Sequence, residues 1–368
     1  MGQHVLFITT GLRKGGAETQ LIKIARFLKS QQYKVRVVSL KPINDFNIDF
    51  QREGLDVVFL KSWSRRPFSN LLRLYKTVRE FNPDVVIAFM FISIIFARFL
   101  KMWFGFNLIS SIRTPVIANK WYVLFKLTAD WDDVVVYNSY KSKSNFEQNK
   151  LVKKPGLVIN NAISIPALSR TSDNHPVKQP FVWISMAHFV PEKDYVTLFK
   201  AISLMKNENF RLDVLGNLFD QDWPFEMIKE LDIAHHVNLL GLKTETSTFL
   251  EKADGFVLSS FLEGMPNALL EAMAYQKPVI ASAVAGIEEL LENVDGGFLF
   301  KQGDALELAS KMKRIMHMPV QEREAMGKNG RRHIEQYFSE EKVLQDWLSL
   351  IGQFAENKVV SLSGFLSQ

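Results

Sequence analysis

Residues 259–274 read SSFLEGMPNALLEAMA, and residue types in this run can bind a phosphorylated ligand. The run is expected to follow a buried strand and to open a helix over 266–275, with Pro266 suited to the first helical turn. Gly264 lets the backbone approach a ligand closely. The amides of Met265, Asn267 and Ala268 then form an anion site at the helix N-terminus.

Two glutamates accompany this anion site. Glu263 lies in the loop before the helix, and Glu271 lies one to two turns inside it, so both carboxylates can face one cleft. An isolated glutamate is more often simply exposed, or stabilised at a helix start by the helix dipole. The Gly, Pro and Asn between them favour a binding role instead. Amides for phosphate and carboxylates for hydroxyl groups suit a nucleotide-sugar.

A glycine pair, Gly15-Gly16, follows the first expected strand. This is not a G-x-G-x-x-G motif, and a strand that turns into a helix needs glycine whether or not a ligand binds. The second strand ends at Ser39-Leu40-Lys41, without the acid that grips the ribose of NAD. A nicotinamide dehydrogenase is therefore disfavoured.

The scaffold that positions these loops reads as two successive α/β series. Continuous runs of Val, Ile, Leu and Phe are typical of parallel strands covered on both faces. In the first half they fall at 4–9, 34–40, 57–60, 85–89, 108–112 and 134–138, with helical patterns between them, notably at 17–30 and 69–81. In the second half they fall at 181–187, 211–215, 237–240, 255–259, 278–281 and 297–300.

Helical patterns separate the second set of strands, at 194–206, 222–231, 244–252, 266–275, 304–317 and 321–337, and a last amphipathic helix is expected at 340–355. The Pro-containing, apolar-poor stretch 166–180 is typical of a linker. We therefore expect two doubly wound, Rossmann-like domains with a ligand-binding cleft between them.

Composition narrows the class of protein. The 368 residues are 47% hydrophobic and 23% charged, as in a globular protein, and no cysteine is present for disulfides or thiolate metal sites. The start Met1-Gly2-Gln3 runs directly into the first apolar strand, so no signal peptide is expected. Residues 1–165 hold 25 Lys and Arg against 11 Asp and Glu, a net +14, whereas the remaining residues hold 20 against 28, a net −8. This asymmetry predicts an anionic partner for the first half.

The 259–274 run resembles the E-x7-E motif of family 4 of the retaining glycosyltransferases, which have the GT-B fold. The similarity continues through Pro278–Ser282 and Ala285–Glu289 and covers most of the chain. The resemblance implies that Glu263 lies against the transferred sugar and that Glu271 holds the nucleotide ribose. It also implies that the glycine pair faces the donor phosphates.

In similar enzymes an Arg and a Lys, six positions apart inclusive, neutralise the departing diphosphate. Lys193 matches that Lys, although a lone lysine at a helix start is more often just solvated. His188 stands where the Arg is expected, and it is a weaker permanent cation. Arg113, at the end of another strand, is assigned to the cleft, and a structural role for it stays equally open.

The resemblance thus implies a full set of site residues. As catalytic groups we expect Glu263, Lys193 and Arg113. The residues expected to bind substrate are Gly15, Gly16, His188, Lys193, Gly216, Asn217, Leu242, Glu263, Gly264, Met265, Pro266, Asn267, Ala268, Leu270 and Glu271. No metal site and no cofactor are expected.

In this interpretation residues 1–165 form the acceptor-binding domain, 166–180 the linker, 181–338 the nucleotide-sugar domain and 339–368 a C-terminal helix that packs back on the first domain. The expected activity is metal-independent, retaining transfer from a nucleotide-sugar, with UDP preferred on resemblance. Without a recognisable nucleophile, retention is expected by same-face attack.

The acceptor is expected to be lipid-linked or a glycolipid, in cell-envelope polysaccharide biosynthesis. Basic residues alternate with aromatic and aliphatic ones at 63–79 and 89–106, which suggests peripheral contact with anionic lipid on the inner face of the cell membrane of a cytoplasmic protein. A buried strand-helix pair with solvated charges is an equally weighted alternative.

Three other functions stay open: a GT-B epimerase, an inverting transferase and a catalytically silent scaffold. A fourth function, nucleic-acid binding through the basic first half, is not supported by any recognisable motif.

Overall fold

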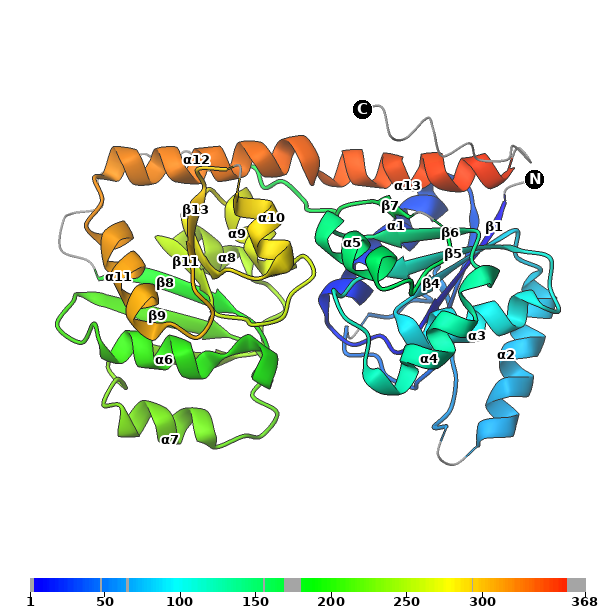
Figure 1. The fold of residues 1–368 in the computed structure, drawn as a ribbon, viewed down its shortest axis with the longest axis horizontal. Coiled ribbons are helices and arrows are strands. Elements are labelled where there is room, and N and C mark those ends of the chain that lie inside the picture. The colour runs from blue at the N-terminus through cyan, green and yellow to red at the C-terminus, as the bar shows by residue number, and fades with distance from the viewer. Residues whose placement is uncertain are drawn as a thin grey trace. The chain divides into compact units, whose positions relative to one another are not determined.

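The computed structural model describes residues 3–46, 48–63, 66–154, 156–168, 180–292 and 294–355. The chain divides into two compact units. Unit 1 comprises Met1–Ala162 with Glu341–Gln368, and unit 2 comprises Ile163–Glu340. Figure 1 shows a twisted sheet with helices on both of its faces in each unit.

Unit 1 is built on a parallel sheet with the strand order β3-β2-β1-β4-β5-β6-β7. Its strands are β1 (His4–Thr9), β2 (Lys34–Ser39), β3 (Asp56–Phe59), β4 (Val85–Phe89), β5 (Asn107–Ile112), β6 (Val134–Tyr137) and β7 (Leu157–Val158). Its helices are α1 (Gly16–Ser30), α2 (Pro67–Phe81), α3 (Phe91–Lys101), α4 (Asn119–Leu127), α5 (Tyr140–Gln148) and α13 (Glu340–Ala355), with a 3-10 turn η1 (Ala129–Trp131).

Side chains of the central strands alternate between two hydrophobic cores, as the period of a strand requires. On β1, Val5 and Phe7 face the core that α1 and α13 complete, while Leu6 and Ile8 face the core beneath α2, α3 and α4. Trp347 of α13 is fully buried in the first of these cores. The last helix of the chain is therefore an integral part of unit 1.

Unit 2 repeats the plan with the strand order β10-β9-β8-β11-β12-β13, again all parallel. Its strands are β8 (Phe181–Met186), β9 (Phe210–Leu215), β10 (Val237–Gly241), β11 (Gly255–Leu258), β12 (Val279–Ser282) and β13 (Gly297–Phe300). Its helices are α6 (Tyr195–Ser203), α7 (Trp223–Glu230), α8 (Ser247–Lys252), α9 (Asn267–Ala274), α10 (Ala285–Leu291), α11 (Ala305–Met316) and α12 (Val320–Tyr337), with a 3-10 turn η2 (Pro191–Lys193).

The expected fold class, two doubly wound parallel α/β sheets, is confirmed. Some details differ from expectation. Pro266 is the N-cap of α9 in extended conformation, one residue before the helix. The helix over 285–291 and the strand over 157–158 were not expected, because both are short and α10 is mostly buried. Of the expected linker 166–180, residues 169–179 lie outside the described ranges.

None of the helices in the described ranges has the length and apolar character that a membrane crossing requires.

Candidate functional site

In unit 2, Lys193 and Glu263 meet although 70 residues separate them in sequence. Lys193 ends the turn η2 after β8, and Glu263 lies in the loop between β11 and α9. The Lys193 Nζ donates to Glu263 Oε1 over 2.5 Å. With 23% and 11% of their side-chain surfaces exposed, the two charges are partly shielded from water. Partial shielding strengthens such a charge-assisted bond.

Serine side chains fix the two loops that carry this ion pair. Ser260 Oγ donates to Glu263 Oε1 over 2.8 Å, and Ser259 Oγ donates to the backbone carbonyl of Lys193 over 2.9 Å. Ser282 Oγ, at the end of β12, donates to the carbonyl of Ser260. The cation and the carboxylate are thus held by three neighbouring strand ends.

The loop from Gly264 to Pro266 brings the start of α9 to the same strand ends. It lies directly against the start of α10, because a Cβ on Gly286 would stand 1.4 Å from the carbonyl oxygen of Gly264. Pro266 caps α9 through its carbonyl, which accepts from the amides of Leu269 and Leu270. A helix start in this position offers the dipole and amides that favour an anion.

The other residues of this run differ in exposure. Glu271 and Ala268 are partly exposed on α9, and Met265 is buried. Leu270 is fully buried in the hydrophobic core of unit 2, so its side chain serves packing, and a contact with substrate through it stays a prediction.

His188 lies in the loop after β8, beside the end of β9. Its Nδ1 accepts the amide hydrogen of Asn217 over 3.1 Å, so the proton of the neutral ring is on Nε2. Gly216 allows the two loops to approach: a Cβ there would stand 1.8 Å from the carbonyl oxygen of Ala187. His188 can therefore offer one N–H donor where the resemblance expects the five donors of an arginine.

A pocket of about 440 Å³ opens beside Asn217 at the ends of β9 and β10. Its rim includes Phe219 and Asp220, two successive non-glycine residues with φ of +52° and +56°. Backbone in this region is uncommon for such residues and is often found at ligand sites. The lining residues are Asn217, Leu218, Phe219, Asp220, Gln221, Asp222, Phe225, Gly241 and Leu242. Two residues expected to bind the donor, Asn217 and Leu242, thus share one cavity.

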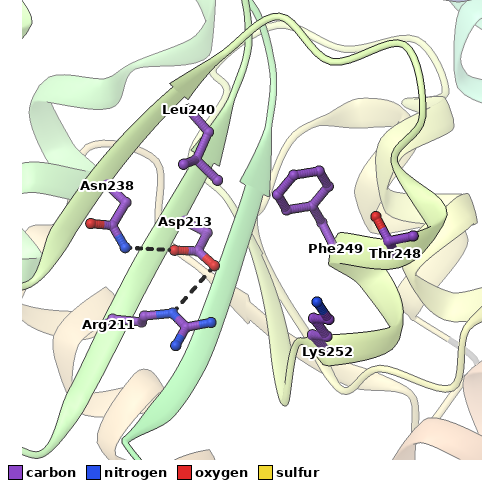
Figure 2. Close-up of a pocket in the computed structure, with 7 residues that line it drawn as sticks. All are labelled: Arg211, Asp213, Asn238, Leu240, Thr248, Phe249 and Lys252. Carbon is purple, nitrogen blue, oxygen red and sulfur yellow. Dashed lines mark hydrogen bonds and ion pairs between the residues drawn. The ribbon is translucent and has the colours of Figure 1, made fainter.

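A second pocket of unit 2, of about 310 Å³, was not expected from the sequence. Figure 2 shows it between α8 and the faces of β9 and β10. Asp213 accepts hydrogen bonds from Arg211 Nε at 3.3 Å and from Asn238 Nδ2 at 2.8 Å. The remaining lining residues are Leu240, Thr248, Phe249 and Lys252. The carboxylate of Asp213 is therefore already hydrogen-bonded by its neighbours on the sheet.

In unit 1 the glycine pair begins α1. Gly15 is the N-cap and Gly16 the first helical residue, after the loop of residues 10–14 that follows β1. Glu18 lies in the first turn, and burial raises the pKa of its carboxyl to about 7, outweighing a backbone hydrogen bond and the charge of Arg13. On sequence grounds Glu18 was given no role of its own, although it lies two residues after the glycine pair that the resemblance places at the donor phosphates.

Arg113, at the carboxyl end of β5, is 8% exposed. Its Nε donates to Ser111 Oγ at 2.9 Å, and its Nη1 donates to the carbonyl of Ile159 at 3.1 Å. The guanidinium also lies 5.4 Å from the ring centre of Phe89 and 5.5 Å from that of Trp347. Burial lowers the pKa of Arg113 to about 9. The guanidinium is therefore surrounded by groups of its own unit. Its assignment to the catalytic groups stays a prediction.

The structure thus brings the expected unit 2 residues into two neighbouring sets: Lys193 and Glu263 beside the start of α9, and His188 beside Asn217. Gly15, Gly16 and Arg113 belong to unit 1. Within the described ranges, no group of three or more His, Asp or Glu side chains is arranged to hold a metal ion.

Two family models together match most of the chain. Residues 14–165 match the model described as Glycosyltransferase Family 4, and residues 169–333 match the one described as Glycosyl transferases group 1. The boundary between the matches falls close to the division between the two units at Ala162.

Full-length relatives carry related names. The chain is 23% identical over 354 residues to the lipopolysaccharide core biosynthesis glycosyltransferase LpsD of Rhizobium meliloti, a match covering 94% of this chain and 96% of LpsD. It is 24% identical over 377 residues to an alpha-1,4-N-acetyl-D-galactosaminyltransferase of Campylobacter jejuni that is named for a PP-undecaprenol-linked substrate, covering 95% and 98% of the two chains.

Among solved structures, HepE of Anabaena, solved in complex with UDP and glucose, aligns with a TM-score of 0.81 at 19% identity. The alignment covers 95% of this chain and 99% of HepE and shows a shared GT-B fold. With glycosyltransferase models matching both halves, the chain belongs to the family 4 and group 1 glycosyltransferases of the GT-B fold and is an enzyme of that class.

Proposed function

We propose that this enzyme transfers a sugar from a nucleotide-sugar, with UDP as the nucleotide, to a lipid-linked or glycolipid acceptor in cell-envelope polysaccharide biosynthesis. Transfer proceeds with retention and without a metal ion. The observation that carries the proposal is the pair formed by Lys193 Nζ and Glu263 Oε1 beside the N-terminus of α9. The ammonium and the helix start suit the diphosphate, and the carboxylate suits the sugar.

In the proposed reaction an acceptor hydroxyl oxygen bonds to the anomeric carbon as the bond from that carbon to the diphosphate oxygen breaks. The attack comes from the face that the diphosphate leaves, and the hydroxyl proton passes to the leaving phosphate oxygen. Lys193 and the first amides of α9 stabilise the charge on that diphosphate. Glu263 orients the sugar and stabilises its developing positive charge, while Glu271 binds the ribose.

The choice of donor and acceptor is supported by relatives. HepE was solved with UDP and glucose. LpsD is named for lipopolysaccharide core biosynthesis, and the Campylobacter jejuni enzyme is named for a PP-undecaprenol-linked glycan. We extend these substrate classes to the present enzyme, with the acceptor bound by unit 1 and the donor by unit 2.

A panel of UDP-, GDP- and ADP-linked sugars tests the donor site. Saturating UDP-sugar is expected to raise the unfolding temperature by several degrees, since ligand at ~100 times its Kd contributes about 2.7 kcal/mol. Lys193→Met should lose most of this shift, and Lys200→Met, which changes an exposed lysine of α6, should keep it. Equal shifts in both variants would remove Lys193 from the donor site.

Three further readings complete the test. A product with the anomeric configuration of the donor supports retention, whereas the opposite configuration contradicts it. Full transfer activity in EDTA supports metal independence. Slow hydrolysis of one donor in the absence of acceptor identifies the sugar.

Peripheral membrane attachment is supported by the surface of α2. Phe68 is 83% exposed and Leu72 is 56% exposed, next to the exposed basic residues Arg73 and Lys76. The helix thus presents apolar side chains among cations, as helices that lie on anionic lipid do. We place this surface on the inner face of the cell membrane.

Sedimentation with vesicles tests this attachment. Binding to vesicles with 30% anionic lipid should exceed binding to neutral vesicles, and Phe68→Ser with Leu72→Ser should reduce it about tenfold, because two apolar side chains no longer insert. Leu306→Ser, at a leucine of α11 that is 71% exposed, is the matched control and should bind normally. Equal binding by all variants would contradict attachment through α2.

A further inference from the structure

Ser260 is fully buried, and its hydroxyl has a defined acceptor. Its Oγ donates over 2.8 Å to Oε1 of Glu263, the same oxygen that accepts from Lys193 Nζ over 2.5 Å. A buried hydroxyl is costly unless it is hydrogen-bonded, so this contact is firmly specified. One carboxylate oxygen thus has two donors from two different loops.

The backbone that carries Ser260 is itself fixed. Ser282, fully buried at the end of β12, donates through its Oγ to the carbonyl of Ser260. The next residue, Phe261, donates its amide hydrogen to the carbonyl of Glu192 over 2.9 Å. The Ser260 hydroxyl therefore approaches Glu263 from a rigid support, as side chains that orient a functional group must.

The two donors to Glu263 differ in what a bound diphosphate would do to them. A diphosphate carries more negative charge than one carboxylate, so it competes with Glu263 for the Lys193 ammonium. A serine hydroxyl is neutral and gains much less from a phosphate. When Lys193 turns from Glu263 to the diphosphate of the nucleotide-sugar, the hydrogen bond from Ser260 still holds Oε1 of Glu263. The other oxygen, Oε2, then faces the sugar.

We propose that Ser260 is a positioning residue, whose hydroxyl holds the Glu263 carboxylate in its working orientation after the donor diphosphate has engaged Lys193. The inference rests on the proposed function, because it takes Glu263 to face the transferred sugar. It adds the requirement that one hydrogen-bond donor to Glu263 is uncharged, so that the negative charge of the bound diphosphate does not compete for it.

The test compares steady-state transfer by the full chain with Ser260→Ala, using the UDP-sugar that the donor screen selects. The kcat is expected to fall about tenfold, the effect of one lost orienting hydrogen bond, while the KM for donor and the Kd for UDP stay within about threefold. Ser185→Ala is the matched control: Ser185 is also buried in unit 2 but bonds to Tyr195, and its kcat should not change.

A double-mutant cycle with Glu263→Gln separates positioning from a structural role. If Ser260 acts through Glu263, adding Ser260→Ala to Glu263→Gln should not lower the single-turnover rate further. Ser260→Cys, which keeps the shape and a weak donor, should show a smaller loss and replaces the alanine variant if that one does not fold.

An unchanged kcat in Ser260→Ala, a loss confined to KM, or an equal further loss in the Glu263→Gln background would each overturn the role of Ser260. Wild-type turnover by Glu263→Gln alone would instead overturn the proposed role of Glu263. The two failures are therefore distinguishable.

Discussion

At the carboxyl end of β5 in unit 1, and again just after β11 in unit 2, a charged side chain follows a buried parallel strand, but the two charges have different surroundings. Glu263 pairs with Lys193, and 11% of its side chain stays exposed. Arg113 is 8% exposed, lies beside the stacked rings of Phe89 and Trp347, and forms no ion pair within the described part of the chain. Two loops that follow parallel strands thus hold, in unit 2, a charge pair of two side chains and, in unit 1, a buried cation bonded to uncharged groups.

The difference shows that a place at the carboxyl end of a strand is insufficient to assign a role. A carboxylate held by an ammonium and a hydroxyl can exchange one partner for a ligand group with little change in desolvation. The buried guanidinium of Arg113 donates to the Ile159 carbonyl, Ser111 Oγ and Asn161 Oδ1, so turning it to a ligand would cost these hydrogen bonds. We therefore expect Arg113 to act on the stability of unit 1, where it contacts Trp347 of α13, whereas Lys193 and Glu263 have the properties of binding groups.

The largest effect that would sharpen this comparison is expected for Glu263→Ala. Turnover should fall about 10³-fold, in the range for a group that stabilises charge in a transition state, while UDP affinity changes little. Steady-state kinetics and calorimetry with UDP measure the two quantities. Glu226→Ala, at an exposed glutamate of α7, is the control and should behave as wild type. Unchanged turnover in Glu263→Ala would place the reaction centre elsewhere.

Arg113→Met should instead act on stability. It removes the hydrogen bonds that Arg113 donates to Ser111 Oγ, the Ile159 carbonyl and Asn161 Oδ1, and relief of a buried charge offsets only part of that cost. We expect a loss of about 2–3 kcal/mol in the free energy of unfolding, measured by urea titration, with UDP affinity unchanged. Normal stability combined with lost turnover would break the comparison and return Arg113 to the catalytic groups.

A smaller effect is expected from Glu18, whose pKa is raised to about 7 in the folded protein from an ordinary value of 4.5. Between these pH values the folded state binds more protons than the unfolded state, so stability is highest below pH 4.5 with respect to this group and declines as pH rises through 7. Glu18→Gln should remove that decline and stabilise the protein by on the order of 2 kcal/mol at pH 8.

Urea titrations of wild type and Glu18→Gln at pH 5 and pH 8 provide the measurement. The difference between the two proteins should be larger at pH 8. A difference that is equal at both pH values would show that Glu18 does not titrate in this window.

Much of the scaffold was predictable because local patterns specify it. The run VVIAF of β4 is buried at every position, as a continuous apolar run in a parallel sheet must be. Gly15 and Gly16 mark the turn into α1, and Pro266 marks the start of α9 to within one residue. In these places the residues that specify an element are also neighbours in sequence.

The site was predictable only as a set of separate motifs, through resemblance. The contact of Lys193 with Glu263, the hydroxyl of Ser260 on the same oxygen, and the approach of Gly286 to Gly264 all join loops that follow different strands. Nothing in the sequence near any of these residues indicates its partner, and the cavity between α8 and the sheet likewise has no local pattern.

The sequence by itself therefore determined the two parallel α/β sheets, the places of their turns and the residue types available at each strand end. Tertiary structure decided which of these charges are paired, which are buried and which pKa values are shifted. The physical reason is that apolar periodicity acts over neighbouring residues, whereas desolvation and Coulomb energy depend on groups that only the packed sheet brings together.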